Sequence, residues 1–205
     1  MADHGVRATQ GYHGRPLERS FYARDGRDGA VELLGKLFVR GERVARIVEV
    51  EAYCGSADPG SHAYRGMTRR NATMFGPAGH LYVYFTYGMH FCANVVCGEE
   101  GEATAVLLRG LEPEAGLDAM RAAYPSARRD RDLCRGPARF CRAFSLDRGF
   151  DGADLVTGDR RVQLVDDGTP PPRVPGVSPR IGLSAGAELP WRFYVPGAAG
   201  LSRRG

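Results

Sequence analysis

The sequence predicts a single α+β domain with a mostly antiparallel β-sheet, flanking α-helices and one protruding β-hairpin. Segments that alternate apolar and polar residues are joined by short turn sequences, which is typical of antiparallel strands. Strand and helix patterns do not alternate regularly along the chain, so a parallel doubly wound sheet is disfavoured. The 205 residues, 43% of them hydrophobic, are enough for one sizeable core but few for two independent ones.

The first predicted elements are a flexible segment and a short helix. Residues 1–17 are rich in Gly, His and Arg without any period, so we expect them to be flexible and to precede a folded domain at 18–205. Asp25 or Asp28 is a candidate N-cap for a helix within residues 21–34.

Two hairpins follow, separated by a long loop. Residues 37–40 and 44–53 flank a Gly-Glu turn and form the first hairpin. Residues 55–80 contain many Gly, Pro, Ser and Asn without a period, so we expect a loop, and loops of this length are usually functional. Residues 81–94 alternate as the second hairpin.

The tip of the second hairpin is apolar, with the sequence Tyr87-Gly88-Met89. Hairpin turns normally carry Asn, Asp, Gly or Ser, which tolerate positive φ and contact water. An aromatic residue exposed there is suited to insertion into a stack of nucleic-acid bases, where it replaces an expelled nucleotide. A three-residue loop would put Asn94 on the face of Tyr84 and a two-residue turn would put it on the opposite face, and the sequence leaves both registers open.

The remaining patterns predict strands and helices in irregular order. A helix begins after Pro113, where apolar residues recur at helical spacing, and a second begins at Gly136-Pro137, since proline suits the first helical turn. The predicted strands lie at 104–111, which ends at Glu112-Pro113, and at 162–164, 179–183 and 191–195.

Composition narrows the class of protein. The net charge of +4 is mild, but Lys36 is the only lysine, so nearly all positive charge is carried by arginine. A coding bias explains this as well as phosphate contact by planar guanidinium groups does. The five cysteines form no Cys-x-x-Cys pair, so no zinc site is predicted. No apolar stretch approaches the ~20 residues of a membrane span, and we expect a cytoplasmic protein with reduced cysteines.

The strand at 44–53 carries the first candidate chemistry. Strict alternation places Glu49, Glu51 and Tyr53 on one face together with Ile47, opposite Val48, Val50 and Ala52. Two carboxylates beside a tyrosine form a candidate site, and solvated charges on a strand surface are the alternative.

Arg109 ends the apolar run 105–108, so its guanidinium must reach water or pair with a carboxylate such as Glu51. A carboxylate held ionised by an arginine can orient a water molecule, as in a hydrolase. His62, His80 and His90 lie in or beside loops, and each alone is weak support for a site.

Five segments in fixed order resemble the alkyladenine (3-methyladenine) DNA glycosylase family, the type found in mammals and many bacteria. They are RIVEVEAYCG at 46–55, RNATMFGPAGHLYVYFTYGMHFCANVV at 70–96, AVLLRGLEP at 105–113, DRDLCRGPARFCRAF at 130–144 and PRIGLSAGAELPWRFYV at 179–195. The resemblance implies a curved antiparallel sheet flanked by helices. It also implies a repair enzyme that flips alkylated or deaminated purines out of duplex DNA and hydrolyses the N-glycosidic bond without a cofactor, leaving an abasic site.

The resemblance also implies roles for particular residues. Glu51 matches the general base that activates the attacking water, and Arg109 matches its water-orienting partner. The other matches are Tyr53, His62 and Tyr84 as walls around the extruded base, Asn94 as the residue that discriminates against guanine, Tyr87 as the wedge in the minor groove, and Met89 and His90 as further DNA contacts.

Two alternatives compete with a monomeric, monofunctional glycosylase. A monofunctional enzyme is predicted because glycosylases that also cleave the strand use an amine to form a Schiff base, and Lys36, the single lysine, lies away from every motif. The first alternative is a non-catalytic module that binds lesions or other nucleic acid. The second is a metal-dependent hydrolase built from Glu49, Glu51 and His62.

Overall fold

The computed structural model describes residues 13–203. Within them, ten strands of 2 to 12 residues form one antiparallel sheet. The main order is β1-β8-β2-β3-β6-β5-β4-β7, with β10 beside β3 and β9 beside β10. The strands are β1 (Arg15–Pro16), β2 (Leu37–Arg40), β3 (Arg43–Cys54), β4 (His80–Thr86), β5 (His90–Cys97), β6 (Thr104–Ala115), β7 (Ala153–Asp154), β8 (Val162–Asp166), β9 (Gly176–Ser178) and β10 (Arg192–Tyr194).

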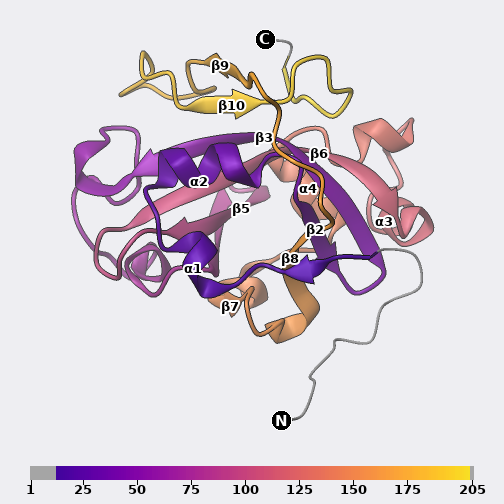
Figure 1. Ribbon diagram of the computed structural model, residues 1–205, viewed down its shortest axis with the longest axis horizontal. Coiled ribbons are helices and arrows are strands. Elements are labelled where there is room, and N and C mark those ends of the chain that lie inside the picture. The colour runs from indigo at the N-terminus through magenta and orange to yellow at the C-terminus, as the bar shows by residue number, and fades with distance from the viewer. Residues whose placement is uncertain (1–12, 204–205) are drawn as a thin grey trace.

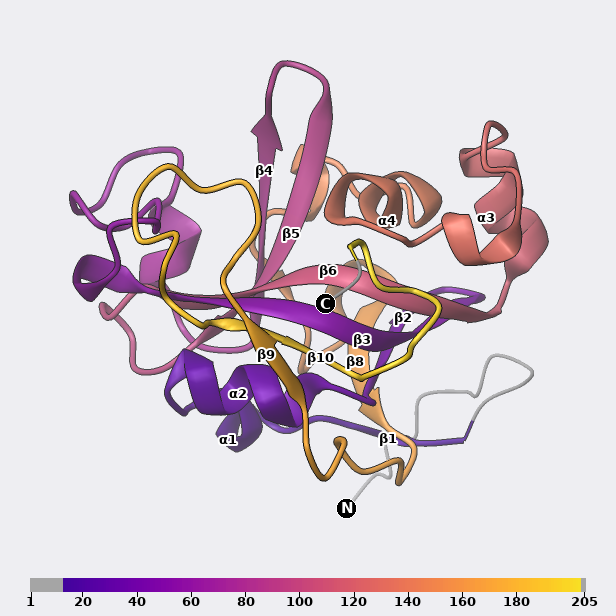
Figure 2. The ribbon, with the colours of Figure 1, turned by 90° about the horizontal axis from the view of Figure 1, so that it is seen from above.

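Four α-helices flank the sheet, namely α1 (Arg19–Tyr22), α2 (Gly26–Leu33), α3 (Leu117–Ala123) and α4 (Pro137–Ala143). Helices α1 and α2 lie on one side of the long strands β3 and β6, and α3 and α4 lie on the other (Figure 1, Figure 2). The predicted α+β class with a curved, mostly antiparallel sheet is confirmed. No helix within residues 13–203 is both long enough and apolar enough to cross a membrane.

The helix expected within residues 21–34 is two helices, because the chain turns between them. Asp25 is the N-cap of α2, and its carboxylate accepts a hydrogen bond from the backbone N–H of Arg27 at 2.8 Å. Pro137 stands in the first turn of α4, as predicted. Of the segment expected to be flexible, residues 1–12 lie outside the described residues, whereas Arg15–Pro16 pairs with β8.

Strands β3 and β6 pair along their whole length, from Val44 opposite Ala115 to Cys54 opposite Thr104. The prediction that the second of these strands ends at Glu112-Pro113 is therefore wrong. Pro113 is tolerated because it lies opposite Ala45, next to a shift in the strand register, where a missing N–H does not interrupt a regular ladder.

An irregularity around Glu49 changes which side chains of β3 face the core. The register shifts on both sides of Glu49, and Ile47 consequently joins Val50 and Ala52 in the main core cluster. The predicted strict alternation, which separated Ile47 from Val50, is wrong at this point because one extra residue reverses the facing of the strand. Glu51 remains on the face opposite the core, as predicted.

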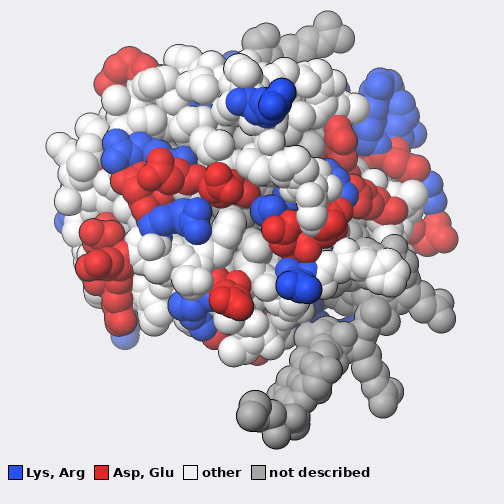
Figure 3. Space-filling model, viewed as in Figure 1, with Lys and Arg blue, Asp and Glu red and all other residues white. Residues whose placement is uncertain are grey.

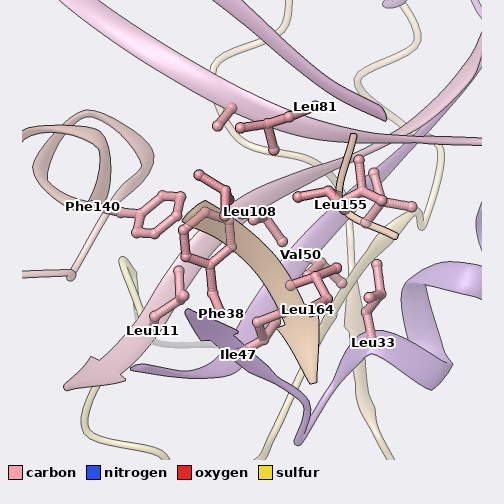
Figure 4. Packing of buried hydrophobic residues seen from close by; sticks show 14 of the residues in the cluster. Leu33, Phe38, Ile47, Val50, Leu81, Leu108, Leu111, Phe140, Leu155 and Leu164 are labelled. Carbon is pink, nitrogen blue, oxygen red and sulfur yellow. The ribbon is translucent and has the colours of Figure 1, made fainter. Parts of the chain in front are cut away.

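The main core ties α2 and α4 to the sheet. Phe38 of β2 meets Phe140 and Phe144 edge to face, with ring centroids 4.8 and 5.2 Å apart. Leu33 of α2 and Leu108 of β6 belong to the same cluster (Figure 4). Each such side chain contributes roughly 1.5–3 kcal/mol on burial, so the middle of the sheet is rigid support for what lies on its other face.

The hairpin formed by β4 and β5 projects from the molecule (Figure 2). Tyr84 lies opposite Cys92 and Tyr82 opposite Asn94, so the loop has three residues and Asn94 shares the face of Tyr82 and Tyr84. This settles the register that the sequence left open.

On the face turned away from the hairpin, acidic and basic side chains are intermixed (Figure 3).

One predicted strand is misplaced. Residues 179–183 are not a strand, and the partner of β10 is β9, which ends at Ser178. Beyond β9, the backbone N–H of Ile181 donates to the side chain of Glu51 in β3 rather than to a neighbouring strand. The predicted strands at 162–164 and 191–195 correspond to β8 and β10.

Candidate active site

A cavity of about 340 Å³ lies along the β4–β5 hairpin, and its lining extends from Tyr82 to Tyr87 at the tip. Strands β3, β4, β5 and β6 each contribute side chains to it, together with the long loop after β3 and the segment after β9. Of the residues predicted from the sequence, its lining includes Tyr53, His62, Tyr84, Tyr87, Asn94 and Arg109. The structure therefore brings together residues that are up to 56 positions apart in the chain, Tyr53 and Arg109 being the outermost.

Glu51 lies directly behind the wall of this cavity and is fully buried. Its Oε1 accepts a hydrogen bond from the backbone N–H of Ile181 at 2.7 Å. Its Oε2 accepts one from the Tyr53 hydroxyl at 2.9 Å and one from Nη1 of Arg109 at 3.3 Å. All three donor residues line the cavity. The predicted pairing of Arg109 with Glu51 is confirmed, and solvated charges on a strand surface are excluded.

Glu49, two residues before Glu51 on β3, is also fully buried. Its Oε1 accepts hydrogen bonds from Nε of Arg109 at 3.3 Å and from Nε of Arg192 at 2.7 Å. The backbone N–H and the hydroxyl of Ser202 also donate to Glu49. Two buried carboxylates thus face two arginines, which offsets most of the desolvation cost that either charge would incur alone.

A second buried ion pair supports the wall from behind. Both side chains of the Arg180–Asp58 pair are inaccessible to solvent, and Nη2 of Arg180 lies 2.7 Å from Oδ1 of Asp58. The Arg180 guanidinium carbon is 4.7 Å from the centre of the Tyr53 ring and 5.1 Å from that of Trp191. Burial, and then the charge of Glu51, raises the pKa of Tyr53, so its hydroxyl stays protonated and can donate to the carboxylate.

Sequence reasoning missed four residues of this arrangement: Asp58, Arg180, Arg192 and Ser202. Arg180, Arg192 and Ser202 reach β3 from distant parts of the chain, and no local pattern marks such contacts. Asp58 lies only four positions after the end of β3, but its partner Arg180 is distant. The segment 179–195 was singled out for its resemblance to a family motif, which was the one available signal for two of the four.

The aromatic side of the cavity is built from His62, Tyr82 and Tyr84. The two tyrosine rings are stacked at 5.3 Å, and His62 meets Tyr84 edge to face at 4.6 Å. His62 Nδ1 and the Tyr82 hydroxyl are 3.2 Å apart. Partial desolvation, and then the positive charge of Arg70, lowers the pKa of His62 below its ordinary 6.5. The imidazole is therefore neutral at pH 7.

Asn94 is buried in the cavity wall opposite Tyr82. Its Nδ2 donates to the backbone carbonyl of Tyr82 at 3.2 Å, across the β4–β5 ladder. This bond fixes the orientation of the amide, which leaves its remaining polar groups to meet whatever enters the cavity.

The tip of the hairpin is exposed and apolar. Tyr87 is 80% exposed and Met89 67% exposed, and His90 and Phe85 are also exposed. Tyr87 adopts a left-handed φ of 50°, which is unusual for an aromatic residue. The turn is closed by the bond from the Met89 N–H to the Thr86 carbonyl at 3.2 Å. Of the predicted DNA-contacting residues, only Tyr87 also lines the cavity.

The metal-site alternative does not match the geometry. Within residues 13–203, no three His, Cys, Asp or Glu side chains gather closely enough to hold a metal ion. Glu49 and Glu51 are bonded to arginines instead, and His62 is bonded to Tyr82 on the aromatic side.

Comparison with known proteins gives consistent results. A family model described as methylpurine-DNA glycosylase matches residues 20–199. A relative from Burkholderia lata with the provisional name 3-methyladenine DNA glycosylase is 55% identical over 185 residues, covering 90% of this chain and 89% of the relative. Relatives with the same provisional name from Streptomyces avermitilis and Carboxydothermus hydrogenoformans are 50% and 45% identical, over 88% and 87% of this chain and 87% and 94% of their own.

Proposed function

The chain belongs to the methylpurine-DNA glycosylase family, and on that premise we propose that it removes alkylated and deaminated purines from duplex DNA. The enzyme is an N-glycosyl hydrolase of DNA repair, and its substrate is DNA. We further propose that the enzyme acts as a monomer and that the residues of the cavity and the hairpin have the roles given below. The observation that carries it is the buried Glu51 carboxylate, held by three donors immediately behind a cavity.

Glu51 acts as the general base in this proposal. Cleavage of the N-glycosidic bond builds positive charge on the deoxyribose, and an anionic carboxylate beside it stabilises that charge while accepting a proton from water. A carboxylate has about four acceptor positions, and the three protein donors to Glu51 leave one for the attacking water. Arg109 donates a hydrogen bond to the carboxylate and helps to orient that water.

Tyr53, His62 and Tyr84 hold the extruded base. Purines methylated at a ring nitrogen, such as 3-methyladenine and 7-methylguanine, carry positive charge in DNA. Aromatic faces attract such cations by ~1–2 kcal/mol in a desolvated site. The lowered pKa of His62 supports this role, because a neutral imidazole does not repel a cationic base. Asn94 discriminates against unmodified guanine through the exocyclic amine of that base. The bond from its amide to the Tyr82 carbonyl fixes Asn94 in the cavity wall, so the side chain does not turn aside to accommodate the amine.

Tyr87 is the wedge that fills the space left by the flipped nucleotide. Flipping costs a few kcal/mol, which stacking of the inserted ring on the neighbouring bases offsets. The 80% exposure of Tyr87 at the tip of a projecting hairpin supports this assignment. Met89 and His90 contact the DNA beside it.

Water rather than an amine is the nucleophile. Lys36 is buried and its Nζ lies 2.9 Å from Asp166, in an ion pair at the junction of α2 and β2 that is not part of the cavity. No other lysine exists in the chain. We therefore expect a monofunctional enzyme that leaves an abasic site.

A multiple-turnover assay on single-lesion duplexes tests this function. We expect release of free base from at least one of 3-methyladenine, 7-methylguanine, hypoxanthine and ethenoadenine duplexes, unaffected by a chelator, with an intact abasic strand as product. A duplex bound but never cleaved would favour the binding-only alternative. A covalent DNA adduct trapped by borohydride would overturn the choice of water as nucleophile.

A further inference from the structure

A second hollow, of about 420 Å³, lies at the turn between β2 and β3, outside the candidate active site. It is formed by this turn and by the 3₁₀ segment η5 (Asp159–Arg161), which are joined by a bond from the Gly41 N–H to the Arg161 carbonyl at 3.2 Å. Its lining consists of Arg40, Gly41, Glu42, Arg43, Arg160 and Arg161. Four of six lining residues are thus arginines.

Neighbouring groups hold two of these arginines in place. Nη1 of Arg40 donates to the carbonyl of Phe144, and its guanidinium carbon lies 4.6 Å from the centre of the Phe150 ring. Nη1 of Arg43 donates to the Ser145 hydroxyl at 2.9 Å. Each uses one terminal nitrogen and keeps further donors for a ligand, because a guanidinium has five N–H groups.

The η5 side of the hollow is fixed in a strained backbone conformation. Arg160 and Arg161 have φ values of 54° and 61°, the left-handed region that residues with a Cβ rarely adopt in succession. Nη1 of Arg160 is anchored by the carbonyls of Gly149 and Asp151. Backbone strain of this kind persists only where the surroundings enforce it, and it concentrates at functional positions.

Four arginines line the hollow together with a single carboxylate, that of Glu42, so positive charge is in excess there. Among residues 13–203, Arg40, Arg43 and Arg161 have no ion pair, and only Arg160 has one, with Asp159 at 3.2 Å. Burial, and then repulsion from Arg43, lowers the pKa of Arg40, with Arg161 acting in the same direction and Asp147 against it. An anion bound among these groups would relieve that repulsion.

We propose that this hollow binds a backbone phosphate of the DNA duplex at a distance from the flipped nucleotide. The proposal rests on duplex DNA being the substrate, as proposed above. Guanidinium forks match phosphate geometry and bind it through paired hydrogen bonds. The lining contains no aromatic or aliphatic side chain that would hold a base or a sugar, so a contact here reads no sequence, as is typical of backbone positioning.

Salt-dependent binding to an undamaged duplex tests the proposal, with Arg161→Asn as the variant. Asn removes the charge but tolerates the left-handed backbone of residue 161. Loss of one phosphate contact should reduce the slope of log affinity against log salt by about 0.9 and weaken binding roughly eightfold at 0.1 M salt. The rate of base release by fully bound enzyme should not change, because Arg161 is not part of the cavity.

Arg173→Asn is the matched control. Arg173 is exposed, and the segment between β8 and β9 that carries it runs on the side away from the hairpin. It should keep the wild-type slope. Arg43→Gln removes the charge of a second lining arginine and should also lower the slope. It provides the test if Arg161→Asn fails to fold.

The proposal is overturned if Arg161→Asn and Arg43→Gln both bind DNA with the slope of Arg173→Asn. A titration with inorganic phosphate, followed by the amide signal of Gly41, separates the two sources of phosphate. Binding of phosphate at low millimolar concentration with unchanged DNA affinity of the variants would mean that the hollow holds a free phosphate compound instead. Absence of base excision by the wild-type enzyme would refute the proposed function, independently of this result.

Discussion

The buried ionic centre beneath the cavity and the exposed hairpin tip beside it are built in opposite ways. In the centre, Glu49 and Glu51 are fully buried and their charges face Arg109 and Arg192. At the tip, Tyr87 is 80% exposed. Preorganised charges act most strongly where water is excluded, whereas capture of a large ligand requires a surface that the protein leaves uncovered. In the proposed function, bond breaking and DNA capture therefore depend on separate regions.

The sheet explains the difference. Strand β3 carries both glutamates and is paired on both edges, with β6 on one side and β2 and β10 on the other. By contrast, β4 is paired with β7 only at 80–81 and β5 with β6 only at 94–97, so within the described chain residues 83–86 and 90–93 pair only with each other. The first region is held by strands on both sides, whereas the tip of the second projects from the molecule (Figure 2).

The largest effect should come from breaking the buried support of the centre. Asp58→Asn leaves the Arg180 charge without its partner in a site that is closed to solvent. Removal of one member of a buried pair costs about 3–5 kcal/mol, and we expect that loss in the free energy of unfolding measured with urea.

Asp154→Asn is the control for this measurement. Asp154 also pairs with an arginine, Arg19 at 2.7 Å, but the arginine side chain of that pair is 40% exposed. Pairs of this kind contribute at most about 1 kcal/mol. If the two substitutions cost the same, the buried pair does not support the centre in the way described.

The next effect concerns the tip. Tyr87→Ala removes the ring that stacks in the vacated position, and stacking is worth about 1–3 kcal/mol per base. We expect the enzyme concentration for half-maximal single-turnover excision to rise roughly 10–100-fold, while the maximal rate changes little. Tyr87→Phe keeps the ring and should behave like the wild type. A fall in maximal rate equal to the loss of affinity would place Tyr87 in the chemical step instead.

The smallest effect is a change of substrate preference with pH. The pKa of His62 lies below 6.5, so the residue is neutral at pH 7 and gains a proton only as the pH falls through that lowered value. A protonated His62 repels a cationic lesion but not a neutral one. The ratio of 7-methylguanine to hypoxanthine excision should therefore decline several-fold as the medium is acidified.

His62→Gln should make that ratio independent of pH, because glutamine does not titrate. His80→Gln serves as the control, since His80 contacts Arg19 and Pro77 rather than the cavity. Taking the ratio of two substrates cancels any change of rate that both substrates share. A ratio in the wild type that rises on acidification would contradict the assigned role of His62.

Much of the first region could be predicted from local pattern, and its support could not. The arginine at the end of an apolar run indicated either contact with water or a pair with a carboxylate such as Glu51, and the structure shows the pair. Arg180 and Ser202 bond to groups on or near β3 from more than a hundred positions away. Such contacts are determined by how the chain closes on itself, for which a single sequence carries no local signal.

The irregularity at Glu49 was missed for a different reason. Alternation assumes a strict period of two, and one extra residue reverses it without changing the composition of the strand. The hairpin register was limited by the same kind of ambiguity, since two- and three-residue loops both fit Tyr87-Gly88-Met89. Pairing of Tyr84 with Cys92 resolved it.

The central claim is that the Glu51 carboxylate carries the bond-breaking step while the hairpin carries capture. The most direct measurement is the single-turnover rate of base release at saturating enzyme for Glu51→Gln beside Tyr87→Ala, on one alkylated duplex. A general base contributes about 10²–10⁴-fold, so Glu51→Gln should lose at least that much of the maximal rate and retain binding, whereas Tyr87→Ala should keep the rate. Release of base by Glu51→Gln at the wild-type rate would contradict the account.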